Sequence, residues 1–315
     1  MTPWLQGSDG LADSLADQAE LAERLGFDSL WLPESHFIGP GAIPAPLLLL
    51  AAVASRTRRI GVATTSYLLP LRHPLHVAAE VAVLDRLSRG RVILGVGRGF
   101  RSATFAAFGV PAREKRDRFE AALAAMRRAW RGEPVAWDEA VGDAPAAPVR
   151  LAPLPVQKPH PPIWVAAFGP KAVAQAGRLG LPYLASPIET LAALEANYAR
   201  HRDAREAAGQ TGPLAVPVMR TVFASRDAAL LRGVREALAA QAAALAKVSA
   251  PNLRRAAGAP IEDWALVGEP EAVAEGVHRY REKLGITHLI VRAQLPGASP
   301  EALVDSLRLL AALER

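Results

Sequence analysis

Side chains that could do acid–base or phosphate chemistry follow several short apolar segments of this chain. These segments are rich in β-branched and aromatic residues, which is typical of buried strands. The carboxyl ends of parallel strands meet at one edge of a sheet or at one face of a barrel, so we expect the groups that follow them to gather there. They are Glu34, Ser35 and His36 after the first segment; Thr65, Ser66, Arg72 and His73 after the second; Arg98 and Arg101 after the third; and the backbone of Phe168 and Gly169 after the fourth.

A basic residue interrupts the apolar face of a helix predicted over residues 112–131. An inward-facing Arg116 in its first turn needs an anionic partner, because an unpaired buried charge is costly. Arg98 could share that partner, and two guanidinium groups could hold one phosphate through bonds of about 1.5–3 kcal/mol each. Amides at Gly169, where another helix begins, could add to the anion site. The face consists of Ala112, Arg116, Phe119, Leu123, Met126 and Trp130, spaced by three and four residues.

Other interpretations of the basic residues stay open at this point. Arg116 could pair with Glu120 on a solvated face, since pairs four residues apart are common on helices. The GVGRG run, residues 95–99, could be only a tight turn between a strand and a helix, and it lacks the full dinucleotide-binding fingerprint. Arg72 and Arg101 are of a type that usually lies at the surface.

The histidines also allow more than one interpretation. His36 could be a packed, hydrogen-bonded histidine, and His73 could simply satisfy the start of the helix that Pro74 opens. A metal site is a further alternative, because histidine and carboxylate side chains are zinc ligands. Its ligands would come from Glu34, His36, His73, His76 and His160, but no HxH or HExxH pair occurs.

The elements that must position these residues alternate between strands and helices, which predicts a parallel sheet with helical crossovers. We expect an α/β fold, a (β/α)8 TIM barrel forming one domain over residues 1–315, with insertions at about 132–160 and 248–268. Only seven strands are visible, so the first strand is expected to be truncated or missing at the N-terminus, near Trp4. The expected strands cover 27–33, 59–69, 91–97, 162–167, 181–186, 214–224 and 287–293. The expected helices cover 9–25, 44–56, 74–88, 112–131, 170–179, 188–208, 226–247, 270–284 and 299–314.

Composition narrows the class of protein. The 315 residues include no cysteine, which removes disulfides and thiolate chemistry. The net charge is +6, but the basic residues are distributed among acidic ones and form no basic block. Nucleic acid is therefore not an expected partner. The sequence shows neither a membrane-spanning run nor a signal peptide, which predicts a cytoplasmic protein.

Three stretches of the sequence resemble the luciferase-like flavin monooxygenases. They are FDSLWLPESHF, the run LLPLRHPLHVAAEVAVLDRLSRGRVILGVGRGF, and VQKPHPPIWVAA, with a weaker continuation in VGEPEAVAEGVHRYREKLGITHLIV. The resemblance implies a (β/α)8 barrel that binds reduced flavin. Many members of the family take reduced FMN from a flavin reductase, whereas others bind the deazaflavin F420, and dimers are usual.

The resemblance also assigns roles to individual residues. It implies that Arg98 and Arg116 hold the flavin phosphate, with further contacts at Phe168 and Gly169. It places a cis non-proline peptide bond between Thr65 and Ser66, under the flavin ring. Luciferases carry two adjacent histidines where this chain has Ser35 and His36, and the first, which is catalytic, is replaced here by serine.

These observations favour a flavin-dependent monooxygenase that uses reduced FMN and oxygen on a small organic substrate. His36 is the expected proton donor or acceptor, and Ser35 could hydrogen-bond a flavin or substrate oxygen. An F420-dependent dehydrogenase that transfers hydride, and a flavin-binding protein without catalysis, are the alternatives. The substrate cannot be identified from the sequence, although the two insertions are expected to form its lid.

Overall fold

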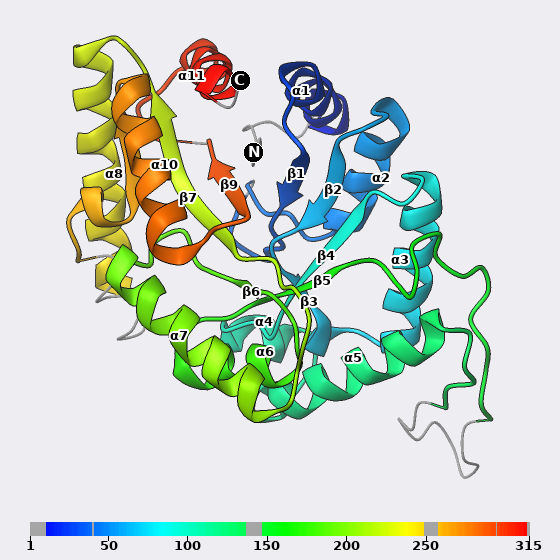
Figure 1. The fold of residues 1–315 in the computed structure, drawn as a ribbon. Helices are drawn as coiled ribbons and strands as arrows, with labels where there is room; N and C mark the ends of the chain where they lie inside the picture. Colours follow the sequence, from blue (N-terminus) through cyan, green and yellow to red (C-terminus); the bar gives the residue numbers. More distant parts are fainter. Residues whose placement is uncertain (1–10, 40, 137–146, 249–257, 294, 314–315) are drawn as a thin grey trace. The chain divides into compact units, whose positions relative to one another are not determined.

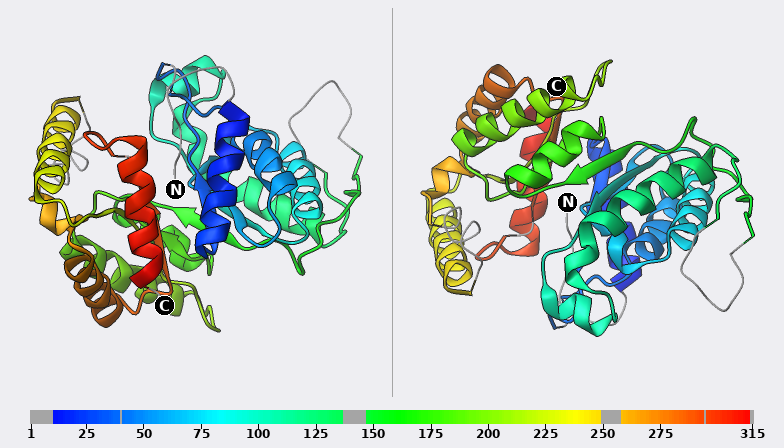
Figure 2. Two further views of the ribbon diagram at one scale, coloured as in Figure 1. Left: turned by 90° about the horizontal axis from the view of Figure 1, so that it is seen from above. Right: turned by 90° about the horizontal axis from the view of Figure 1, so that it is seen from below.

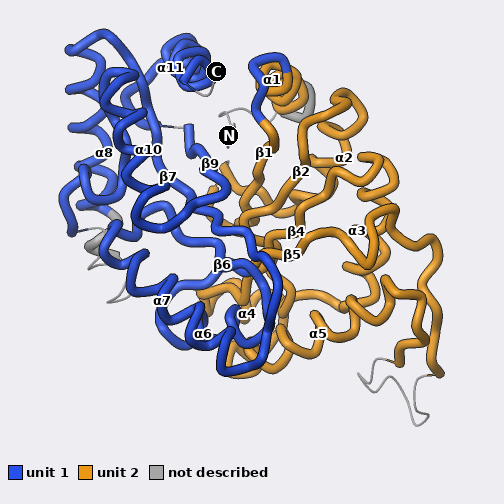
Figure 3. Tube along the Cα trace, viewed as in Figure 1, with its two compact units in different colours: residues 1–3, 24–27, 165–315 blue, residues 4–23, 28–164 orange. Residues whose placement is uncertain are grey.

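The computed structural model describes residues 11–39, 41–136, 147–248, 258–293 and 295–313. The chain divides into two compact units, which Figure 3 distinguishes by colour. The N-terminal unit comprises residues 4–23 and 28–164, and the C-terminal unit comprises residues 1–3, 24–27 and 165–315. The expectation of a single domain over residues 1–315 depends on how these two units combine, so it stays a prediction.

The N-terminal unit alternates strands with helices (Figure 1). Its elements are α1 (Leu11–Leu25), β1 (Ser29–Leu32), α2 (Pro46–Arg56), β2 (Gly61–Thr64), β3 (Tyr67–Leu68), the 3-10 helix η1 (Leu69–Leu71), α3 (Pro74–Leu87), β4 (Val92–Gly97), α4 (Ser102–Ala107), the 3-10 helix η2 (Ala112–Glu114), α5 (Lys115–Trp130) and the first half of β5 (Ile163–Ala166).

The strands of this unit form a parallel sheet in the order β1-β2-β4-β5, with β3 also paired to β4. Leu30 lies opposite Val62 in the β1–β2 register, and Val62 opposite Val92 in the β2–β4 register. Three of the four residues of β1 and of β2 are buried, as are five of the six in β4. Such continuous burial is typical of parallel strands that are covered on both faces. Helices α2, α3 and α5 lie along the outer side of this sheet (Figures 1 and 2).

The C-terminal unit continues the alternation. Its elements are the second half of β5, α6 (Pro170–Arg178), β6 (Tyr183–Leu184), α7 (Leu191–Ala207), β7 (Pro217–Ala224), α8 (Ala228–Val248), the 3-10 helix η3 (Ile261–Asp263), β8 (Ala265–Gly268), α10 (Pro270–Leu284), β9 (His288–Arg292) and α11 (Pro300–Leu313). Strands β8, β7 and β9 form a parallel sheet with β7 in the centre. Val222 of β7 packs with Val273 of α10 and Leu310 of α11.

Proline marks the start of five helices. Pro46, Pro74, Pro170, Pro270 and Pro300 stand in the first turns of α2, α3, α6, α10 and α11. Proline suits this position because its fixed φ is helical and the first N–H groups of a helix have no intrahelical partner. These helix starts agree with the sequence pattern to within two residues.

The seven expected strands are all present, but the strand β8 and the helix α4 were not predicted. Residues 265–268, expected to be irregular, form β8, because their backbone pairs with Thr221–Ala224 of β7. Residues 102–107, expected to be a loop, form α4. The expected truncated first strand falls on residues 1–10, outside the described residues. In the expected insertion at 132–160, Val135 and Val149 form an antiparallel bridge. Within the described ranges, no helix has the length and apolar character needed to cross a membrane.

Candidate functional site

The carboxyl ends of β1, β2 and β4 lie side by side in the sheet of the N-terminal unit. The loops that follow carry Glu34 to His36, Thr65 and Ser66, and Arg98, respectively. The amide of Thr65 donates to the carbonyl of Leu32 at 2.7 Å, which ties the second loop to the end of β1. Three of the four loops expected at this edge therefore meet within one unit.

A buried carboxylate, Glu34, connects the loop after β1 to the segment after β2. Its side chain is 0% exposed. Oε2 accepts a hydrogen bond from the amide of Leu68 at 2.8 Å, and Oε1 accepts one from Nη1 of Arg72 at 2.8 Å. The same Oε1 lies 2.5 Å from Nε2 of His36. Interpreting Arg72 as a surface charge is wrong, because its side chain is only 22% exposed and neutralises this buried carboxylate.

His36 is largely enclosed, and two aromatic rings flank it. The residue is 9% exposed, and its ring centre lies 5.8 Å from that of Phe37 and 5.0 Å from that of Phe108. Both phenylalanines are themselves exposed, at 71% and 45%. The alternative interpretation of His36 as a packed, hydrogen-bonded histidine is therefore confirmed, and its role in proton transfer stays a prediction. This packing leaves an apolar, solvent-facing surface directly beside an imidazole.

Ser35 holds the loop after β1 in place. Its amide donates to the carbonyl of Ile43 at 2.9 Å, and its Oγ accepts from the amide of Ile43 at 2.9 Å. Because Oγ acts as the acceptor in this pair, the hydroxyl hydrogen is not used in it. A hydrogen bond from Ser35 to a flavin or substrate oxygen stays a prediction.

The segment after β2 packs against the glycine run after β4. The peptide bond between Thr65 and Ser66 is cis, as the resemblance implies. A Cβ added to Gly97 would collide with Oγ of Ser66 and lie 2.9 Å from its Cβ, so only glycine fits opposite this segment. Gly99 has a φ of +72°, and a Cβ there would lie 3.1 Å from the ring of Phe105. Steric demands thus explain both glycines that flank Arg98.

Basic side chains form a cluster at the end of β4. Burial lowers the pKa of Arg98, and the nearby charge of Arg116 lowers it further, while Glu120 acts in the opposite direction. Burial and the charge of Arg98 likewise lower the pKa of Lys115. Among the described residues, the Arg98 guanidinium makes no hydrogen bond or ion pair. Arg98 is therefore repelled by both Arg116 and Lys115, and such an excess of positive charge favours binding of an anion.

The exposure of Arg116 differs from the sequence prediction. Phe119, Leu123, Met126 and Trp130 are all buried, so the predicted apolar face of α5 is confirmed for these residues. Arg116, however, is exposed, so the expectation of a buried charge at this position is wrong. It stands in the first turn of α5, where the side chain can stay in water and avoid the cost of burying a charge. Its effect on the pKa of Arg98 still places the two guanidinium groups near each other.

The expected phosphate contacts at Phe168 and Gly169 lie in the C-terminal unit. Gly169 precedes α6 with a φ of +91°, and no side chain caps that helix start. Phe168 and Gly169 are both partly buried. Their contribution to the phosphate site stays a prediction.

Two further histidines, His73 and His160, have local partners. Nδ1 of His73 accepts from the amide of Leu75 at 3.3 Å, so His73 caps α3 as the alternative interpretation proposed. His160 makes a 2.8 Å contact with the carbonyl of Pro161 and packs against Trp130. No group of three or more histidine, aspartate or glutamate residues in the described part of the chain could hold a metal ion.

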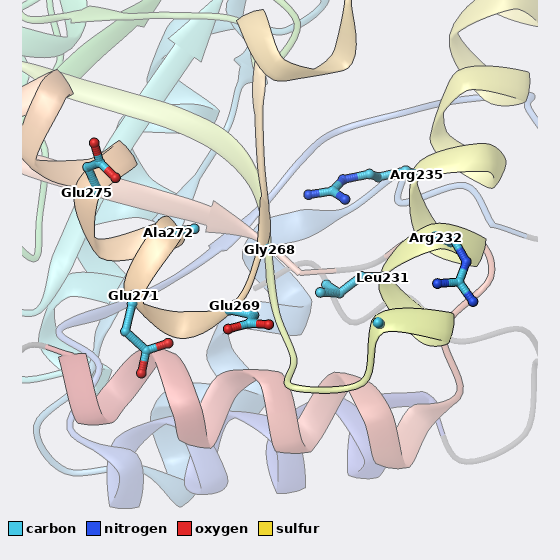
Figure 4. Close-up of a pocket in the computed structure, with 9 residues that line it drawn as sticks. Leu231, Arg232, Arg235, Gly268, Glu269, Glu271, Ala272 and Glu275 are labelled. Atoms are coloured by element: carbon cyan, nitrogen blue, oxygen red, sulfur yellow. The ribbon is translucent and has the colours of Figure 1, made fainter.

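A separate cavity of about 580 Å³ lies in the C-terminal unit (Figure 4). Arg232 and Arg235 line it from α8, and Glu269, Glu271 and Glu275 line it from the start of α10. Nη2 of Arg235 already donates to the carbonyl of Val267 at 2.6 Å, and Glu271 pairs with Arg226 at 2.8 Å. Charges of both signs surround this cavity, so it does not indicate one class of ligand.

Comparison with known proteins identifies the family that this chain resembles. The family model described as luciferase-like monooxygenase matches residues 2–288. The oxygenase component of the flavin-dependent trigonelline monooxygenase of Acinetobacter baylyi is 31% identical over 165 residues, which cover 51% of this chain and 45% of that protein. The F420-dependent glucose-6-phosphate dehydrogenase of Beutenbergia cavernae is 39% identical over 170 residues, covering 51% of this chain and 48% of that protein. The chain thus spans about half the length of these relatives.

A solved structure shares the fold. The oxygenating constituent of the 3,6-diketocamphane monooxygenase of Pseudomonas putida, in complex with FMN, matches with a TM-score of 0.81 at 22% identity, covering 98% of this chain and 94% of that one. The expected fold class, a luciferase-like α/β barrel fold with parallel strands, is thereby confirmed. The sequence motifs, the parallel strands and the family match together show that the chain belongs to the luciferase-like monooxygenase family.

Proposed function

We propose that this chain is the oxygenase component of a flavin-dependent monooxygenase, which binds reduced FMN and acts with oxygen on a small organic substrate. The observation that carries the proposal is the cluster of Arg98, Lys115 and Arg116 at the end of β4. Burial and the charge of Arg116 lower the pKa of Arg98, burial and the charge of Arg98 lower that of Lys115, and Arg98 makes no hydrogen bond to a described residue. Such a cluster suits the doubly charged phosphate at the end of FMN.

The residues of the chain have separate tasks in this proposal. Arg98, Lys115 and Arg116 bind the phosphate, and the loop of Thr65 and Ser66 supports the ring system. Bound reduced FMN supplies the electrons for the reaction with oxygen. His36 holds or moves a proton at one of its ring nitrogens beside the reacting centre.

The exposed rings of Phe37 and Phe108 support an organic substrate with an apolar body. They lie beside His36, so a substrate packed on them would bring a reacting group close to the imidazole. Its packing would also displace water from that ring. Ser35 could donate its hydroxyl hydrogen to an oxygen of the substrate or flavin.

The partners in this proposal follow from the relatives. The trigonelline enzyme is named as an oxygenase component, which supports a separate flavin reductase as the source of reduced FMN. We also propose that the chain forms a homodimer and is located in the cytoplasm.

Anaerobic titration followed by mixing with oxygen tests the proposal. We expect reduced FMN to bind tightly and the return of the oxidised-flavin absorbance to be delayed relative to free reduced FMN. Failure of the protein to bind reduced FMN would refute the assignment.

The second candidate is an F420-dependent dehydrogenase, which the similarity to the Beutenbergia enzyme favours. It would transfer hydride without using oxygen. Preference for F420 over FMN in the same titration, with no response to oxygen, would select it. Tight flavin binding without any change in the reaction with oxygen would indicate a flavin-binding protein that is not a catalyst.

A further inference from the structure

We propose that Glu34 is a positioning residue that holds His36 as the tautomer protonated on Nε2 and so leaves Nδ1 as the proton acceptor of the neutral ring. The catalytic meaning of this inference rests on the proposed function, in which His36 moves a proton. The tautomer itself is a property of the protein without cofactor.

Glu34 accepts hydrogen bonds from two groups that can only donate. Oε1 accepts from the guanidinium of Arg72 at 2.8 Å, and Oε2 accepts from the amide of Leu68 at 2.8 Å. An arginine stays protonated in proteins and can only donate, as can a backbone amide. Both carboxyl oxygens are therefore engaged as acceptors, and Glu34 forms an ion pair with the adjacent guanidinium.

An ionised carboxylate fixes the tautomer of the neighbouring imidazole. Oε1 of Glu34 lies 2.5 Å from Nε2 of His36, and an ionised carboxylate has no hydrogen to donate. Nε2 must therefore carry the hydrogen of this bond. In the neutral ring the other nitrogen, Nδ1, then has a free lone pair. Among the described residues, no hydrogen bond involves Nδ1 of His36.

The surroundings hold Glu34 in one place. Arg72 stacks over the ring of Tyr67, with its central carbon 4.0 Å from the ring centre. The hydroxyl of Tyr67 donates to the exposed carboxylate of Glu80 at 3.0 Å. These charged and polar groups come from the loop after β1, from β3, from the segment after η1 and from α3. The ring of Tyr67 holds the guanidinium of Arg72 beside Glu34. Glu34 therefore cannot turn away from His36 without breaking its hydrogen bonds to Arg72 and Leu68.

The tautomer of His36 can be measured directly in the wild-type protein. Long-range 15N–1H correlation spectra separate the two neutral tautomers, and a His36→Gln variant assigns the signal among the seven histidines. At a pH of about 8.5, above the usual histidine pKa of about 6.5, we expect His36 to be almost wholly protonated on Nε2. A His36 protonated mainly on Nδ1 would overturn the proposal, whether or not any variant folds.

Variants of two carboxylates then test the role of Glu34. In Glu34→Gln the side-chain amide can donate as well as accept, so we expect a mixture of tautomers. Glu34→Asp retains a carboxylate and should restore at least part of the Nε2–H preference. Glu80→Gln is the matched control, because it changes a carboxylate of the same network that does not touch His36, and it should leave the tautomer unchanged. An unchanged tautomer in folded Glu34→Gln would also contradict the proposal.

Affinity for FMN separates this inference from the proposed function. We expect the Kd of Glu34→Gln for reduced FMN to stay within about twofold of the wild-type value, because Glu34 does not belong to the cationic cluster. If the wild type fails to bind FMN but shows the Nε2–H tautomer, the proposed function fails and the positioning role stands. If FMN binds but the tautomer is wrong, only the positioning role fails.

Discussion

Replacing Arg98 by methionine should separate phosphate binding from every other part of flavin binding. Methionine retains much of the apolar volume of the arginine stem but removes the charge and all the donors. Riboflavin has the same ring system as FMN and lacks the phosphate. We therefore expect Arg98→Met to weaken FMN binding strongly and riboflavin binding little.

The size of the effect follows from the burial of the two guanidinium groups. A hydrogen bond to a charged group is worth about 1.5–3 kcal/mol, so losing one raises Kd about 10- to 150-fold. Arg98 is partly buried and should fall in this range. Arg116 is exposed, where ion pairs are worth about 0–1 kcal/mol, so Arg116→Met should raise Kd by less than about tenfold.

Stability distinguishes loss of binding from loss of folding. The charges of Arg116 and Lys115 repel Arg98 in the folded chain. Removing Arg98 relieves that repulsion, so the free energy of unfolding of Arg98→Met should not fall below that of the wild type in the absence of flavin.

Fluorescence titration with the two reduced flavins and urea unfolding measure these effects. Arg101→Met is the control, since Arg101 is an exposed cation in the same loop. Equal losses for FMN and riboflavin, or no loss for either, would refute the assignment of the phosphate to this cluster.

Three further predictions concern packing and pH, each measured by urea unfolding. Gly97→Ala should lower the free energy of unfolding by about 1–3 kcal/mol, because its Cβ collides with Ser66; an unchanged midpoint would contradict this close approach. Trp130→Phe should cost about 0.5–1.5 kcal/mol, since it removes the 2.9 Å hydrogen bond from the indole to the carbonyl of Ala78, and a neutral result would show that another group replaces this donor. Burial lowers the pKa of His201, so the unfolded state binds its proton more readily and stability falls as pH drops below about 6.5; His201→Gln should reduce that slope, and an identical slope would exclude this histidine as its source.

The sequence by itself determined the alternation of strands and helices and the residues that follow each strand. These features depend on local patterns: proline at helix starts, the period of the apolar residues in α5, and glycine at 97 and 99. The family motifs also placed the cis peptide bond between Thr65 and Ser66, and they predict that Arg98 and Arg116 bind one phosphate. None of these inferences required knowledge of which distant segments touch.

The tertiary structure alone decided which of those residues meet. Glu34 and Arg72 are separated by 38 positions, and their pairing depends on how the segment after β2 packs against the end of β1. Strand β8 lies in a stretch expected to be irregular and is defined by its pairing with β7. The exposure of Arg116 likewise depends on where the core ends along α5. Pairing, burial and charge neutralisation arise between segments distant in the chain, and for that reason the role of Glu34 is visible only in the folded protein.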